Sequence, residues 1–264
     1  GDIFRIPVFI ITSSDNEETF IDAYHLGAVD VIVKPFITHF LKCRVANIIE
    51  LYRHRNNLES IVTEQLTRLN SMNRSMVETL ASVIEFRSCE SGEHVRRISY
   101  ITSVLMTAIS EMYTEYYHSK NDIDHIAMAA VLHDVGKISI PDLILNKPAK
   151  LTKPEFEIMK GHTIKGCEIL SSIPSEMMDK EVYQLSYDIC RHHHERWDGG
   201  GYPDGLKGDE ISIHAQAVAI ADVYDALTSP RVYKAAYSHE KALEMIFNGE
   251  CGCFNPKVIE AFKL

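Results

Sequence analysis

The sequence predicts a mainly α-helical protein that begins with a small α/β module. Residues 38–85 contain neither proline nor glycine, and their apolar side chains recur at steps of three and four, which is typical of a long helix. The same spacing returns in three segments beyond residue 85. Near the N-terminus, by contrast, the apolar residues form two short runs of the length of buried strands.

The α/β module is expected within residues 1–50. Its strands are the apolar runs at 6–11 and 31–33, and residues 16–26 between them have helical spacing that stops at Gly27. A strand, a helix and a second strand in this order predict a parallel pairing, because the helix carries the chain back to the same end of the sheet.

This module resembles the second half of a response-regulator receiver domain in the wording IPVFIITS and GAVDVIVKPF. The resemblance implies that Thr12 is the switch hydroxyl and Lys34 the phosphate-contacting lysine, whereas Val31 stands where a receiver usually has its switch aromatic. The phospho-accepting aspartate of the first half is missing, and the chain begins at Gly1 without a methionine. We therefore expect an upstream segment to carry that aspartate, and a histidine kinase to be a partner of the complete receiver.

A linker helix is expected over residues 51–84. Apolar residues at Leu51, Leu58 and Val62, continuing through Leu69 to Met76, follow the seam of a two-stranded coiled coil. This pattern predicts a homodimer formed through the long helix. The alternative is that the helix folds back on the rest of the chain.

The third unit, residues 85–264, is expected to be helical. Residues 98–112, 126–135 and 238–247 have apolar side chains at helical spacing. Four prolines divide the unit by marking loops. These are Pro141, Pro148, Pro154 and Pro203.

Eight residues of this unit are candidate metal ligands, all of them nitrogen or carboxylate-oxygen donors. They are Glu90, His94, His133, Asp134, His162, His193, His194 and Asp222. A set without thiolates favours iron or manganese in a hydrolytic centre, with zinc as an alternative. One ion needs three or four protein ligands, so eight ligands predict at least two ions, the arrangement used for attack on a phosphodiester. His192 precedes the adjacent histidines, but helical geometry would turn its side chain elsewhere.

From about Met76 onward the chain resembles an HD-GYP domain, the cyclic di-GMP phosphodiesterase branch of the HD hydrolases. The matching stretches are EFRSCESGEHVRR (85–97), the HD segment (133–162), HHERWDGGGYPDGLKGDEI (193–211), AIADVYDALTSPRVYKAAY (219–237) and FNPKVIEAF (254–262). The resemblance implies an all-helical HD-type bundle that hydrolyses cyclic di-GMP to linear pGpG.

The resemblance also assigns roles to the candidate ligands. Asp134 is the expected bridge between two ions, and Glu90 with His94 matches the pair that family members with a third ion supply. A third ion would favour further cleavage to GMP. The alternative for Glu90 is an ordinary acid at a helix end.

Four residues are expected at the substrate. Lys137 resembles the lysine beside the scissile phosphate, where its charge would act together with Asp134 in catalysis. Arg231 and Lys234 match family positions that contact the dinucleotide. Tyr202, in the GYP loop, is expected to shape the substrate mouth, with simple loop packing as the alternative.

Composition limits the remaining possibilities. The formal charge of −10 argues against binding to a nucleic-acid polymer, and no apolar run approaches the ~20 residues that span a bilayer. The six cysteines lack zinc-site spacing, so we expect reduced thiols in a cytoplasmic protein. The alternatives to the main prediction are hydrolysis of another cyclic dinucleotide, such as cyclic GMP-AMP, and binding of a cyclic dinucleotide without hydrolysis. The GYP loop argues against a general HD nucleotide phosphohydrolase.

Overall fold

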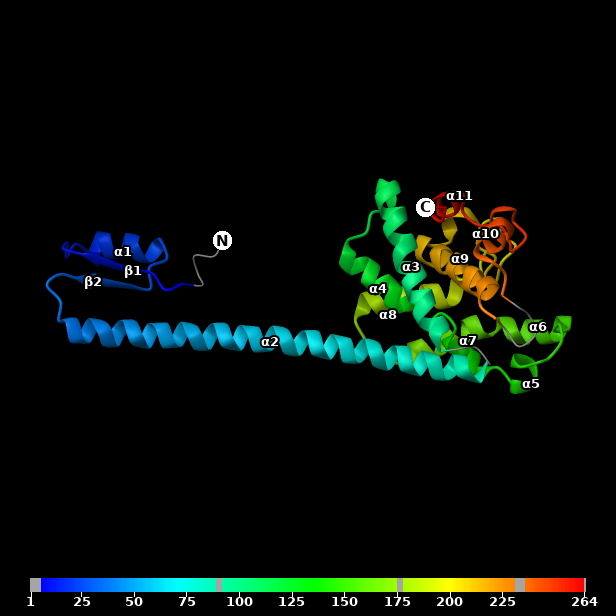
Figure 1. Ribbon diagram of the computed structural model, residues 1–264, viewed down its shortest axis with the longest axis horizontal. Coiled ribbons are helices and arrows are strands. Elements are labelled where there is room, and N and C mark those ends of the chain that lie inside the picture. The colour runs from blue at the N-terminus through cyan, green and yellow to red at the C-terminus, as the bar shows by residue number, and fades with distance from the viewer. Residues whose placement is uncertain (1–5, 89–91, 175–177, 231–235, 264) are drawn as a thin grey trace. The chain divides into compact units, whose positions relative to one another are not determined.

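The computed structural model describes residues 6–88, 92–174, 178–230 and 236–263 (Figure 1). The chain forms two compact units, Gly1–Met72 and Asn73–Leu264, which are described separately. The division falls within the longest helix, so that helix contributes to both units.

The first unit contains the predicted strand–helix–strand arrangement. Strands β1 (Phe9–Thr12) and β2 (Asp30–Val33) pair in parallel, with Ile10 opposite Val31. Helix α1 (Glu17–His25) connects them, and its first turn is capped by the Asn16 side chain. The parallel pairing predicted from the alternation of elements is confirmed.

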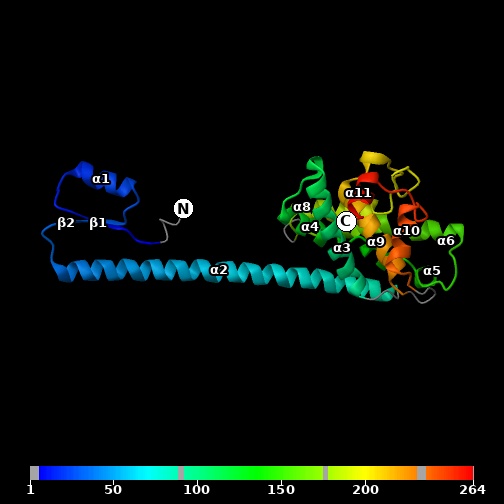
Figure 2. The same cartoon turned by 45° about the horizontal axis from the view of Figure 1, so that its top comes forward.

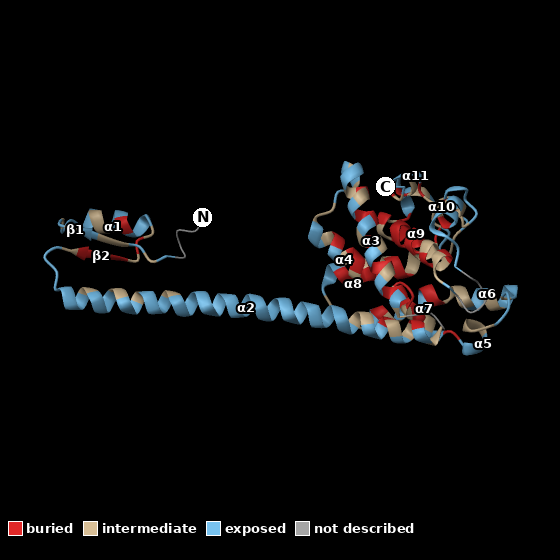
Figure 3. Ribbon diagram, in the orientation of Figure 1, coloured by how far each residue is buried: buried red, intermediate tan, exposed pale blue. Residues whose placement is uncertain are grey.

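Helix α2 (Thr38–Arg87) is continuous over 50 residues, which confirms the predicted long helix. Figure 3 shows that most of α2 is exposed, and its buried residues are Ala81 and Glu85 near its C-terminal end. Those last turns belong to the second unit, in which Ala81 forms a cluster with Val95 and Val131, and Val77 packs against it. Among the described residues, no helix combines the length and apolar character needed to cross a membrane.

All regular secondary structure in the described parts of the second unit is helical, as predicted. Four of its helices, α3, α4, α8 and α9, pack around one apolar core that includes Ile98, Met106, Ile126, Ile189 and Ile220 (Figures 1 and 2). The α-helices of this unit after α2 are α3 (Glu93–Met112), α4 (Lys120–Ala130), α5 (Asp142–Leu145), α6 (Lys153–Lys160), α7 (His162–Ser171), α8 (Lys180–His192), α9 (Ile213–Thr228), α10 (His239–Phe247) and α11 (Pro256–Ala261).

The expectation of a helix over 126–135 is wrong at its C-terminal end. Helix α4 stops at Ala130, and the chain turns through the HD pair into the 3-10 helix η3 (Val135–Ser139). Asp134 leaves helical geometry, with φ −105° and ψ 12°. At Gly136 the backbone lies so close to α7 that an added Cβ would sit 1.9 Å from the carbonyl oxygen of His162. The turn therefore brings the HD pair against α7, which a continued helix could not do.

Candidate metal centre

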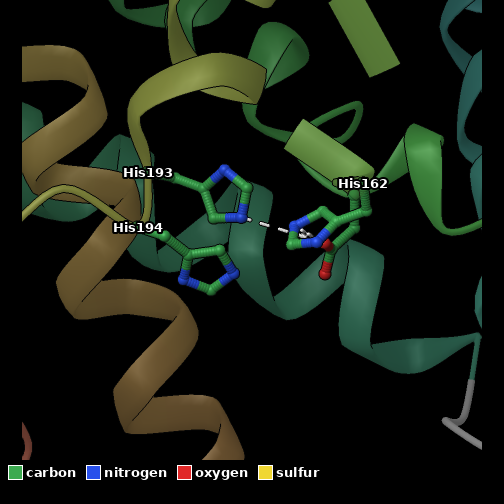
Figure 4. Close-up of side chains that lie close together, drawn as sticks. His162, His193 and His194 are labelled. Carbon is green, nitrogen blue, oxygen red and sulfur yellow. Dashed lines mark ion pairs between the residues drawn. The ribbon is translucent and has the colours of Figure 1, made fainter. Parts of the chain in front are cut away.

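Five helical segments supply the donor side chains. His133 and Asp134 lie in the turn after α4, and His162 is the first residue of α7. His193 and His194 follow the last turn of α8, and Figure 4 shows them reaching toward His162 from the opposite side. The remaining described candidates lie within helices: His94 on α3 and Asp222 on α9.

The donors form two groups with one member in common. The first group is Asp134 with His162, His193 and His194, and the second is His94 with His133 and Asp134. Within each group the potential ligand atoms lie within 4.8 Å of one another. These are the distances at which side chains can share an ion after small adjustments.

The carboxylate of Asp134 is directed toward both groups. Its Oδ1 lies 3.2 Å from Nε2 of His162 and 3.8 Å from Nε2 of His193. Its Oδ2 lies 3.1 Å from Nε2 of His133. Each oxygen of this carboxylate faces a different set of imidazoles. A ligand that bridges two ions requires this geometry.

Three of these histidines are oriented by the main chain. In each, Nδ1 donates to a carbonyl three or four residues earlier, and the other ring nitrogen faces the cluster. The bonds run from His133 to Ala130 at 2.8 Å, from His162 to Met159 at 2.8 Å and from His193 to Ile189 at 3.0 Å. Because Nδ1 then carries the proton, Nε2 is left with the lone pair that a metal ion needs.

Whether a metal ion fits this site can be judged from its buried ligand atoms that lack hydrogen-bond partners. Within the described structure, Nε2 of His133, His162 and His193 and Oδ1 of Asp134 are buried and form no hydrogen bond. A buried polar atom that lacks a partner is costly, and divalent cations in the two groups would satisfy all four atoms. Imidazole nitrogens with a carboxylate suit iron, manganese or zinc, so these residues fit the predicted ions.

Burial and charge together set the pKa values here. Burial lowers the pKa of His193 and of His194 well below the usual value, and neighbouring imidazoles lower it further. Burial also opposes protonation of His133, but the adjacent Asp134 carboxylate outweighs it and raises the pKa of His133 to about 9. His193 and His194 are thus held neutral beside the Asp134 carboxylate, whose own pKa the nearby Lys137 and His133 hold well below its usual value despite burial. A neutral imidazole beside an anionic carboxylate is the protonation state that binds metal.

His94 is oriented by side chains rather than by the main chain. Its Nδ1 lies 2.7 Å from Oδ2 of Asp225, and its Nε2 lies 3.9 Å from Oδ1 of Asp222. Arg97 donates to both oxygens of Asp225 and, at 2.8 Å, to Ser229. Hydrogen bonds from His94 and Arg97 outweigh burial and lower the pKa of Asp225 to about 2. Sequence reasoning missed Asp225, although its place one helical turn after Asp222 was a usable signal.

Lys137 lies at the edge of the cluster. Its Nζ is 2.7 Å from Oδ2 of Asp134 and 3.7 Å from Oε2 of Glu85, and its side chain is largely buried. Lys137 is therefore not an ordinary surface lysine. Glu85 was also missed by sequence reasoning, because nothing local indicates that an acid at the end of α2 would be buried beside the HD turn.

The GYP loop is anchored by the acid that follows the two histidines. Glu195 is buried, and its carboxylate accepts hydrogen bonds from the backbone N–H groups of residues 204, 205 and 206 at 2.7–3.1 Å. This bonding places the Tyr202 ring 4.8 Å from that of His194, at the border of the cluster. His192, as expected, points elsewhere and bonds Asp188 and Asp204.

Three of the predicted site residues lie outside the described parts of the chain: Glu90, Arg231 and Lys234. Their predicted roles, in a third metal site and in dinucleotide binding, therefore stay predictions.

The arrangement defines a class of helical proteins in which an HD pair and distant histidines gather around metal ions. Residues 56–257 match the profile of the HD domain family. The chain belongs to this family. A "Probable cyclic di-GMP phosphodiesterase" of Vibrio cholerae is 40% identical over 98% of this chain and 60% of its own length. The "Cyclic di-GMP phosphodiesterase response regulator RpfG" of Xanthomonas campestris is 34% identical over 97% of this chain and 66% of its own length.

These matches confirm the resemblance to cyclic di-GMP phosphodiesterases that the motifs indicated. The chain spans about two thirds or less of these relatives. A solved structure of a cyclic GMP-AMP specific phosphodiesterase of V. cholerae has the same fold over 72% of this chain and 47% of its own, with a TM-score of 0.50 and 17% identity.

Proposed function

We propose that this chain is a metal-dependent phosphodiesterase that hydrolyses cyclic di-GMP to linear pGpG and then to GMP. The observation that carries the proposal is that one buried carboxylate, that of Asp134, is directed at two separate groups of imidazoles. The relatives' names point to the same substrate.

The candidate site residues that the structure describes would each have a part in this reaction. His133, His162, His193 and His194 would hold two ions with Asp134 between them. Divalent ions at this site supply Lewis-acid polarisation of the phosphoryl oxygens and a lower pKa for a bound water. Lys137, held beside Asp134 by an ammonium–carboxylate contact of 2.7 Å, would stabilise negative charge that develops on the phosphate.

The ions are proposed to be iron or manganese, with zinc as the alternative. His94 and Asp222, joined by Glu90, would hold a third ion, and the third ion would support cleavage of the linear product. Metal analysis of the purified protein, before and after reconstitution, tests both the identity and the number.

Product chromatography tests the activity. The protein is incubated with cyclic di-GMP, cyclic GMP-AMP or pGpG, and cyclic di-GMP should be consumed fastest and end as GMP. Replacing both His133 and Asp134 with alanine should abolish turnover. Faster loss of cyclic GMP-AMP would reassign the substrate, and binding without turnover at full metal loading would make the chain a sensor.

The long helix is proposed to form a homodimer. Val62, Leu69, Met76 and Val83 recur every seven residues on α2 and are more than half exposed, as a coiled-coil seam requires in a single chain. Light scattering should give twice the chain mass for the parent and for Thr67→Glu, which lies off the seam. Leu69→Glu, on the seam, should give a monomer, and a monomeric parent at micromolar concentration would contradict the proposal.

Residues 1–50 are proposed to be the second half of a receiver domain in a cytoplasmic signalling protein, with a histidine kinase as partner. The match of one relative that is named a response regulator supports this, since the match covers 97% of the chain. Phosphotransfer from a kinase to the longer gene product, followed by assay of cyclic di-GMP hydrolysis, tests it.

A further inference from the structure

The last turn of α2 holds the segment that carries Lys137. The guanidinium of Arg87 donates to the carbonyl oxygens of Ile138 at 2.5 Å and Ile140 at 2.9 Å, and lies 3.5 Å from that of Lys137. One planar group thus binds the backbone at the C-terminal end of the 3-10 helix η3. Such a fork loses little freedom on binding, because its donors are fixed in one plane.

Two further contacts fix the position of Arg87 itself. The carboxylate of Asp142 lies 2.9 Å from the guanidinium, and the side-chain amide of Asn146 donates to the Arg87 carbonyl oxygen at 3.0 Å. The end of α2 and residues 137–146 are therefore joined by both the side chain and the main chain of one residue.

The same helical turn also reaches the ammonium group of Lys137. Glu85 lies two residues before Arg87 and is 3% exposed, with Oε2 at 3.7 Å from the Lys137 Nζ. Asp134 approaches that Nζ from the cluster at 2.7 Å. A flexible lysine is thereby confined between two carboxylates, one from the metal cluster and one from α2.

We propose that Arg87 and Glu85 are positioning residues for Lys137, so that the C-terminal turn of α2 determines where this lysine meets the substrate phosphate. The inference rests on the proposed function, because it assigns Lys137 a role at the phosphate. Neither Arg87 nor Glu85 needs to touch the substrate. A displacement of about 1 Å at a reacting group is enough to slow a reaction by up to ~100-fold.

The test is a double-mutant cycle with Arg87→Gln and Lys137→Met, in manganese-loaded protein of the full chain. Turnover is measured on cyclic di-GMP and on bis(p-nitrophenyl) phosphate, which contains a phosphodiester but no guanine. Arg87→Gln should lower kcat by about tenfold, with KM within about twofold, and should have no further effect when Lys137 is already methionine. Arg87→Lys should recover part of the rate, and Glu85→Gln should lower kcat in the same way.

Arg96→Gln is the matched control, since Arg96 is exposed on α3 and lies 3.9 Å from its partner Glu78. Melting temperature and metal content should be equal in the parent, the control and Arg87→Lys. A crystal structure of Arg87→Gln supplies a readout that is independent of turnover, and Lys137 Nζ should have moved away from Asp134.

The outcomes separate this inference from the proposed function. If cyclic di-GMP is not hydrolysed, the proposed substrate is refuted. The double-mutant cycle measured on bis(p-nitrophenyl) phosphate and the crystal structure of Arg87→Gln still decide the role of Arg87. Any one of three results would overturn the inference. These are an equal loss of kcat from Arg87→Gln in the presence and absence of Lys137, an unchanged kcat in Arg87→Gln, and an unmoved Lys137 in its crystal structure.

Discussion

The two donor groups around Asp134 are built in different ways. In the first, the ring nitrogens of His162 and His193 are fixed by carbonyl oxygens of their own helices or turns. In the second, His94 is fixed by the carboxylate of Asp225, which Arg97 holds in turn. The first group therefore depends on helix geometry, which most substitutions leave intact. In the second group the main chain also fixes His133, but the orientation of His94 depends on particular side chains. We expect the ion site that includes His94 to be the more easily lost.

The largest effect is expected for Asp134→Asn, because this residue belongs to both groups. An amide keeps the shape but loses the charge, so both sites should lose metal and turnover should fall by roughly 1000-fold or more. Metal content and rate measured on the same preparation check this. Exposed Asp209→Asn serves as the control, and a full metal content in the Asp134 variant would contradict the shared-ligand geometry.

A smaller and selective effect is expected for Asp225→Asn. His94 would lose the acceptor that fixes its tautomer, and turnover should fall by about 10–100-fold. Metal analysis should show loss from the group of His94, while the group of His162 keeps its ion. Equal loss from both groups would mean that the two halves are not independently built.

The close contact between the HD turn and α7, which brings Asp134 near His162, can be tested at Gly136. A Cβ there would collide with the His162 carbonyl oxygen, so Gly136→Ala should force α7 away and reduce stability by about 3 kcal/mol. Thermal unfolding measures the loss. Gly161→Ala is the milder comparison, because its nearest contact would lie at 3.0 Å rather than 1.9 Å. Equal melting temperatures would show that the turn has room to adjust.

A histidine pair away from the cluster gives the smallest expected effect. His118 and His214 face each other with 3.0 Å between their Nε2 atoms, and burial followed by the His118 charge lowers the pKa of His214 to about 4, although Asp188 partly opposes this. Below pH 6.5 the unfolded chain takes up a proton that the folded chain refuses. Stability should therefore be complete above pH 6.5 and decline by about 1–2 kcal/mol as the pH falls toward 4, after allowance for partial exposure.

Chemical denaturation at several pH values measures that decline. His214→Gln cannot take up the proton and should flatten the curve over this interval. An unchanged slope in the variant would assign the pH dependence to other groups.

The sequence was informative wherever neighbouring residues determine the outcome. The period of the apolar side chains predicted α2, and adjacent donors such as His193 and His194 marked the cluster. It was less informative where distant segments meet. The buried position of Glu85 depends on how the end of α2 packs against the HD turn, and the bond from Asp225 to His94 spans 131 positions. The end of α4 at Ala130 was missed because the turn after it depends on a distant contact. That turn brings Gly136 against α7, and local sequence preference does not indicate this contact.

The anchoring of the GYP loop by Glu195 has a consequence for how such proteins diversify. The carboxylate recognises only main-chain N–H groups, which every residue type except proline provides. Side chains at the tip of the loop can therefore be exchanged by evolution or by an engineer to suit a different base, while the hydrogen bonds from Glu195 keep the loop in place. Conversely, an inactive Glu195 variant would reveal a collapsed loop and would say nothing about metal ligation.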